Sequence, residues 1–68
     1  MPHHVYKIIQ ITGTSTKSSD DAVRVAVHKA SETIHNLRWF KITEIRGDIN
    51  GSDIGHWQVT LDVGFTLD

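Results

Sequence analysis

Two short segments of this chain combine a tryptophan with polar side chains that could bind a flat ring. Leu37-Arg38-Trp39-Phe40 and His56-Trp57-Gln58-Val59 contain both tryptophans of the sequence. An indole is a large, rigid, electron-rich plane that can fill a core or stack on an aromatic ligand. A nearby glutamine offers a donor and an acceptor to the edge of a heterocycle. These residue types favour recognition of a planar heterocycle. The position of each tryptophan in the fold decides which of the two could stack on such a ligand.

Size and composition limit how such a site can be built. The 68 residues predict a single domain, 1–68, and so short a chain buries only about 60% of its unfolded surface. It has no cysteine, which excludes disulfides and thiolate zinc sites and leaves association of subunits as the usual source of extra stability. The formal net charge of −1, without a basic or acidic block, argues against nucleic acid or an anionic membrane as partner.

The beginning of the sequence predicts a cellular location. Met1-Pro2-His3-His4 lacks the apolar run of a signal peptide, and no segment reaches the length of a membrane span. We therefore expect a soluble, cytoplasmic protein without membrane contact.

The first half of the chain predicts a strand followed by a helix. Residues 5–12 are rich in β-branched and aromatic side chains, with apolar character on both faces, which is typical of a strand. Residues 13–19 are turn-forming and indicate a loop, with Ser18 or Ser19 as helix N-cap. A helix of roughly four to five turns is expected next, and Asn36 can end it. Its apolar stripe consists of Val23, Ala26, Val27, Ala30, Ile34 and Leu37.

The second half predicts two strands joined by a hairpin. Residues 37–48 alternate imperfectly, and simple alternation places Trp39, Thr43 and Ile45 on one face and Phe40, Ile42, Glu44 and Arg46 on the other. Gly47, Asn50 and Gly51 mark the hairpin connection. Residues 54–67 alternate cleanly, which puts Trp57 on the apolar face, packed against the helix, and Gln58 on the polar face.

The expected fold class is α+β, with the order β-α-β-β. A helix between the first two strands makes them parallel, and the third strand lies between them in a three-stranded sheet of order 1-3-2, antiparallel to both. One helix covers only one face of this sheet. The open face and the unpaired outer edges predict assembly with further subunits.

At this point the sequence resembles a known family. The segments VYKIIQITGTS, DDAVRVAVHKAS, LRWFKITEIRG and HWQVTLDVGFTL follow in order the pattern of the dodecins, from Val5 to Leu67. The resemblance implies a hollow, roughly spherical homododecamer with helices outside and sheets facing inwards. Dodecins bind flavins as antiparallel pairs between tryptophans of symmetry-related subunits. Bacterial members often hold FMN and some also hold coenzyme A, whereas archaeal members prefer smaller flavins such as riboflavin.

The resemblance also assigns candidate cofactor-binding residues. Trp39 matches the flavin-stacking tryptophan and Gln58 matches the glutamine at the flavin edge. Arg46 matches a position near the flavin in bacterial members, and Glu44 stands in the same block, although the two could simply form an ion pair. Trp57 is a departure, because many dodecins have tyrosine there. The implied function is flavin storage and sequestration rather than catalysis.

Other site chemistries have weaker support. The five histidines show no HExxH or paired-carboxylate spacing, so no protein-made catalytic metal site is expected. Ions on the symmetry axes of a dodecamer are left open, because one polar side chain repeated by symmetry can make a site. Gly13-Thr14-Ser15 lacks the glycine and lysine pattern of a phosphate loop, and no nucleophile elbow is present. A small flavin-dependent redox protein and a structural oligomer without flavin remain the alternatives.

Overall fold

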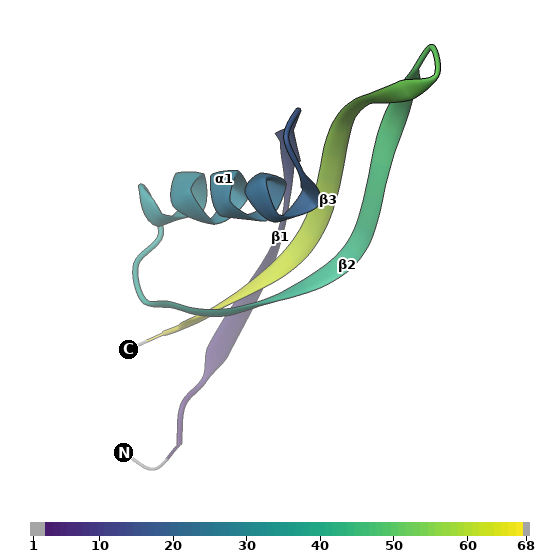
Figure 1. Ribbon diagram of the computed structural model, residues 1–68. Coiled ribbons are helices and arrows are strands. Elements are labelled where there is room, and N and C mark those ends of the chain that lie inside the picture. Colours follow the sequence, from purple (N-terminus) through teal and green to yellow (C-terminus); the bar gives the residue numbers. More distant parts are fainter. Residues whose placement is uncertain (1–2, 68) are drawn as a thin grey trace.

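The computed structural model of the chain describes residues 3–67 as one helix and a three-stranded sheet (Figure 1). Strand β1 spans Tyr6–Ser15, helix α1 Ser19–Ser31, strand β2 Leu37–Asn50 and strand β3 Asp53–Thr66. The strand order is β1-β3-β2, and β3 runs antiparallel to both neighbours. The predicted element order, the sheet order 1-3-2 and the parallel direction of the first two strands are confirmed.

Helix α1 begins where the sequence predicts and ends earlier. The side chain of Ser18 accepts a hydrogen bond from the backbone N–H of Asp21 at 3.0 Å, which satisfies a donor that the first turn leaves free. The backbone N–H groups of Glu32 and Thr33 bond to carbonyls three residues back, at 3.2 Å each, which is the tightened geometry of a last turn. The predicted end at Asn36 is wrong, because Asn36 lies in the connection to β2 with a left-handed φ of 66°.

The core lies between α1 and the central strand β3. Val59 and Leu61 are fully buried and Val63 is nearly so, against the small side chains of Ala22 and Ala26 on the helix. Alanines let a helix approach a sheet closely, because no larger side chain separates the two backbones. This packing fixes one face of the sheet as the helix-facing side.

Glycine at position 13 is part of the same close approach. A Cβ on Gly13 would lie 2.2 Å from the carbonyl oxygen of Ala22 and 2.8 Å from the Cβ of Ala26. Gly13 pairs with Val59 within β1, and the pairing continues to Ser15. The prediction that a loop begins at Gly13 is therefore wrong for residues 13–15, since the glycine serves helix packing rather than a turn.

Trp57 differs from its predicted environment. By alternation along β3 it shares the helix-facing side with Val59, as expected. It is only half-buried, however, and lies outside the core cluster. The predicted packing of Trp57 in the core is therefore wrong, because the buried cluster between α1 and β3 begins at Val59 and extends away from Trp57.

The chain is long and thin for its size. Its radius of gyration is 14.1 Å, whereas a compact globule of this length has about 11 Å. Figure 1 shows α1 on one face of the sheet and the β2–β3 hairpin extending past the end of β1. Large apolar side chains of β2 remain uncovered, among them Phe40, Ile42 and Ile45. Within residues 3–67, no helix has both the length and the apolar character needed to cross a membrane.

Candidate functional site

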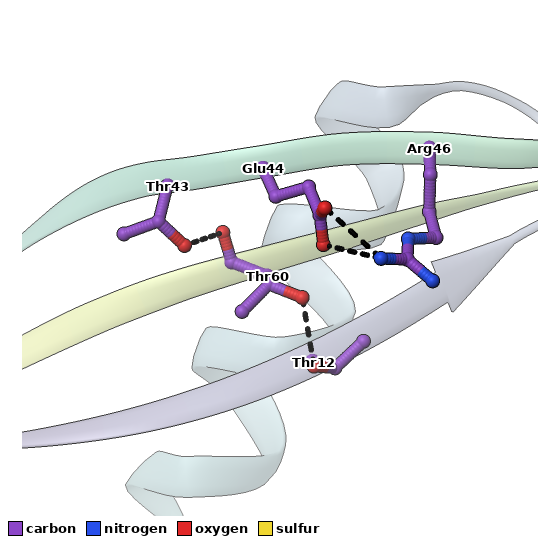
Figure 2. A network of polar contacts seen from close by, with 5 residues as sticks. All are labelled: Thr12, Thr43, Glu44, Arg46 and Thr60. Carbon is purple, nitrogen blue, oxygen red and sulfur yellow. Dashed lines mark hydrogen bonds and ion pairs between the residues drawn. The ribbon is translucent and has the colours of Figure 1, made fainter.

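Strand β2 changes face at a bulge, and this change positions the candidate site. Its pairing with β3 is regular from Trp39 to Ile42 and shifts between Ile42 and Glu44, so Thr43 is an extra residue without a partner. The hydroxyl of Thr43 donates a hydrogen bond to the backbone carbonyl of Thr60 at 3.1 Å, which holds the bulge in place (Figure 2). Side chains after Thr43 therefore point to the side opposite the one that simple alternation predicts.

All four predicted site residues lie on the face of the sheet opposite the helix. Cross-strand partners share a face, and the partners here are Gly64 for Trp39, Thr60 for Glu44 and Gln58 for Arg46. These β3 positions alternate with the core residues Val59, Leu61 and Val63, so they point away from α1. Figure 2 shows the side chains of Glu44 and Arg46 in front of the sheet with the helix behind it.

The expected division of β2 into two faces is thus wrong. Alternation alone separates Trp39 from Glu44 and Arg46, whereas the structure brings the three to one side. Ile45 moves to the helix-facing side, where it pairs with Val59. The physical reason is the additional residue at Thr43, which advances β2 by one position without advancing β3.

The indole of Trp39 lies directly on the backbone of β3 at Gly64. An ideal Cβ at Gly64 would fall 2.2 Å from Cε2, 2.3 Å from Cζ2 and 2.8 Å from Cδ2 of the indole. Three fused-ring atoms at such similar distances place the ring face over the glycine. Gly64 is buried beneath it, while 38% of Trp39 stays exposed. One face of the indole is therefore covered by the strand, and the other can stack on a ligand.

Arg46 and Glu44 form an ion pair further along β2. The Nη2 atom of Arg46 donates to Oε1 and to Oε2 of Glu44, at 2.9 Å each. This hydrogen bond first, and the negative charge of Glu44 second, raise the pKa of Arg46 above its ordinary value. Both side chains are largely exposed, so the pair adds little to stability. Because a single nitrogen makes both contacts, the rest of the guanidinium lies outside this pair.

Further polar contacts extend across the same face. Thr12 and Thr60 share a hydrogen bond of 3.0 Å between their hydroxyls, and Gln10 donates to Asp62 at 3.2 Å. Near the hairpin, Asp48 lies 2.8 Å from Nδ1 of His56. Polar side chains therefore line this face of β3 between the region beside Trp39 and the β2–β3 hairpin.

The candidate residues form two groups rather than one. Gln58 lies beside Arg46, whereas Trp39 lies on Gly64, six residues further along β3. At about 3.3 Å per residue, the two groups are roughly 20 Å apart along the strand. A single ligand ring cannot reach both within one chain.

One neighbour of Trp39 is missing from the sequence-based set. The ring centroid of Tyr6 lies 6.0 Å from that of Trp39, and the rings meet edge to face at 61°. The alternation of side chains along β1 places Tyr6 on the same face as Gln10 and Thr12. Only the order of the strands in the sheet brings this face of β1 beside Trp39.

A separate cavity of about 620 Å³ opens on the helix-facing side between α1 and β2, away from this site. Its lining consists of Val23, Val27, Phe40 and Ile42 together with the polar residues Asp20, Arg24, His28 and Ser31. It belongs to the uncovered apolar surface. Within residues 3–67, no group of three or more histidine and acidic side chains is arranged to hold a metal ion.

Comparisons with known proteins agree with this architecture. The family model described as Dodecin matches residues 5–68. Dodecin from Thermus thermophilus is 39% identical over 64 residues, which are 94% of this chain and 93% of that protein. The solved structures of dodecins from Streptomyces davaonensis and Streptomyces coelicolor superpose with TM-scores of 0.90 and 0.92, at 49% and 44% identity. The aligned part is 96% of both chains for the first, and 100% of this chain and 97% of the other for the second. This chain therefore belongs to the dodecin family.

Proposed function

We propose that this protein stores and sequesters flavin, with FMN or riboflavin held as stacked pairs between Trp39 side chains of two symmetry-related subunits. The observation that carries this proposal is the indole of Trp39, which lies with one face on Gly64 and has its other face free on the polar side of the sheet. A core tryptophan would bury both faces. In a member of the dodecin family, a tryptophan held in this way is suited to stacking on a planar ligand.

The chemistry of the residues fits an isoalloxazine. This ring system is planar and electron-poor, and stacking on an electron-rich indole contributes roughly 0.5–1.5 kcal/mol beyond the burial of area. The pyrimidine edge of the flavin alternates carbonyl acceptors with an N–H donor. The amide of Gln58 can complement this edge, and the cationic Arg46 can pair with a phosphate or a ring oxygen. Glu44 would hold the guanidinium of Arg46 in place through the contact at 2.9 Å.

The separation of the two groups supports a site shared between subunits. Trp39 and Gln58 lie roughly 20 Å apart along β3, which is longer than three fused six-membered rings. A flavin stacked on Trp39 would therefore meet Gln58 and Arg46 of another copy of the chain. Binding would then stabilise the assembly, since the ligand binds only where two copies meet.

The same reasoning supports a closed homododecamer. The elongated subunit, the uncovered β2 side chains and the cavity beside α1 all leave apolar surface that further copies would bury. A flavin enclosed between two indoles is shielded from solvent, and electron transfer from the indole would quench its excited state. Protection of the cell from free-flavin photochemistry, without catalysis, is the function that these features support best.

Titration of the apo-protein with riboflavin, FMN and FAD, followed through flavin emission, tests this proposal. We expect quenching with one flavin per chain, strong loss of binding in Trp39→Ala, and normal binding in the matched control Trp57→Phe. Absence of quenching in the wild-type protein would instead support a structural oligomer without flavin. Rapid turnover with NAD(P)H would support a redox protein.

The assembly is tested separately by mass measurement in solution. We expect a dodecamer for the wild-type protein and for Trp39→Ala, because the truncated indole lies on the ligand side of the sheet. A stable monomer or dimer would contradict the proposed architecture.

A further inference from the structure

The position of Tyr6 in the sheet gives it access to Trp39 across the central strand. Tyr6 pairs with Thr66 and Trp39 pairs with Gly64, so the two aromatic residues flank β3 from opposite sides. The outer strands lie about 9.6 Å apart, two strand spacings, which is too far for contact unless the central strand offers free space. Gly64 provides this space because it has no side chain.

The contact between the two rings has a favourable geometry. Their centroids are 6.0 Å apart at an interplanar angle of 61°, within the range of edge-to-face aromatic pairs. One face of the indole thus contacts Gly64, and Tyr6 lies beside the indole. Contact with Gly64 alone would leave the indole able to rotate about its side-chain bonds over the strand.

We propose that Tyr6 is a positioning residue of the flavin site, whose ring keeps the indole of Trp39 flat over Gly64 with its outer face free for the ligand. The inference rests on the proposed function for the identity of the ligand, but the contact between the rings does not depend on it. Tyr6 acts through Trp39, so its aromatic ring rather than its hydroxyl carries the effect.

The surroundings of Tyr6 argue that its role is local. Its side chain is 45% exposed, on the face away from the helix, and it is absent from the core cluster formed by α1 and β3. Truncation of the ring would therefore leave the core packing intact. A residue required only for folding would be expected inside that cluster instead.

The test uses the Trp57→Phe background, in which Trp39 is the sole tryptophan. The long-wavelength tryptophan bands of near-ultraviolet circular dichroism, where tyrosine does not absorb, and acrylamide quenching of Trp39 emission report the order of the indole without any flavin. We expect Tyr6→Ala to weaken the dichroism, to increase acrylamide quenching and to reduce flavin affinity roughly 2- to 10-fold. We expect Tyr6→Phe, the matched control, to retain wild-type values, and both variants to keep the wild-type oligomeric state.

The possible outcomes separate this inference from the proposed function. If the indole signals change in Tyr6→Ala but no variant binds flavin, the proposed function fails while the positioning role stands. If flavin affinity falls while the indole signals stay unchanged, Tyr6 does not act through Trp39 and the inference is overturned. Equal behaviour of Tyr6→Ala and wild type in all three measurements, or a defect in Tyr6→Phe as large as in Tyr6→Ala, also overturns it.

Discussion

Substitution of Gly64 by alanine should displace the indole of Trp39 with the smallest possible chemical change. The added Cβ would lie 2.2 Å from Cε2 of the indole, closer than real Cβ contacts occur. To reach 3.4 Å, where ordinary contact begins, the ring must move by about 1.2 Å away from the strand. The move is directed outwards, into the space where a stacked ligand would lie.

The size of the effect follows from this displacement. In the proposed assembly, two facing indoles that each moved outwards by about 1.2 Å would narrow the space for a flavin pair by about 2.4 Å, a large part of the thickness of one aromatic ring. Either the stacking is lost, at about 0.5–1.5 kcal/mol per ring, or the tightened packing costs about 1–3 kcal/mol. We therefore expect flavin affinity to fall by at least about twofold and by as much as about 100-fold, since about 1.4 kcal/mol corresponds to a factor of ten.

The assay is flavin titration combined with the emission of Trp39 in the Trp57→Phe background. Gly55→Ala is the matched control on the same strand, because its Cβ would meet the carboxylate at the end of the Asp48 side chain, at 2.7 Å, rather than a ring. We expect Gly55→Ala to bind flavin like the wild type. If Gly64→Ala binds and quenches flavin normally with unchanged Trp39 emission, the placement of the indole over Gly64 is wrong.

Three further substitutions test the fold and the polar face, each measured by chemical denaturation at fixed chain concentration. Gly13→Ala should lower the free energy of unfolding by about 1–3 kcal/mol, because its Cβ would lie 2.2 Å from the carbonyl oxygen of Ala22; wild-type stability would contradict the close approach of α1 to β1. Ser18→Ala should lower the free energy of unfolding by about 1 kcal/mol, because the helix cap is lost, and Ser18→Asp should restore most of this stability. Wild-type stability of the alanine variant would show that the cap is dispensable. Arg46→Ala should leave the free energy of unfolding almost unchanged, because the ion pair with Glu44 is exposed, while weakening the proposed binding of FMN. A large loss of stability would mean that the pair is buried in the assembly.

Much of the fold could be predicted from hydrophobic periodicity and capping. The regular alternation of residues 54–67 identified β3, and its apolar positions Val59, Leu61 and Val63 are the core. The aspartates Asp20 and Asp21 indicated the start of α1 and narrowed its N-cap to Ser18 or Ser19, of which the structure shows Ser18. The strand order 1-3-2 was expected as an arrangement that one helical crossover and one hairpin allow, and the structure has it. The four candidate site residues came from the family resemblance, not from periodicity, and their contact with flavin remains a prediction.

Element ends were less predictable, because they depend on tertiary contacts. Ile34 and Leu37 continue the helical stripe in sequence, yet α1 ends at Ser31, and the chain turns through Asn36 to enter β2. Gly13 looked like a turn residue, and only its distance to Ala22 explains why a strand position has no side chain. Local sequence cannot encode such a distance between two elements.

The sequence by itself determined the two aromatic segments, the β-α-β-β order and the side of β3 that faces the helix. Only the tertiary structure decided how β2 presents its side chains. A prediction from alternation assumes that every residue of β2 has a partner on β3. This assumption fails at Thr43, which has no partner in the register with β3. That single bulge brings Glu44 and Arg46 to the face of Trp39. The same register sets Trp39 six residues from Gln58, a separation that no single chain can close around one ligand.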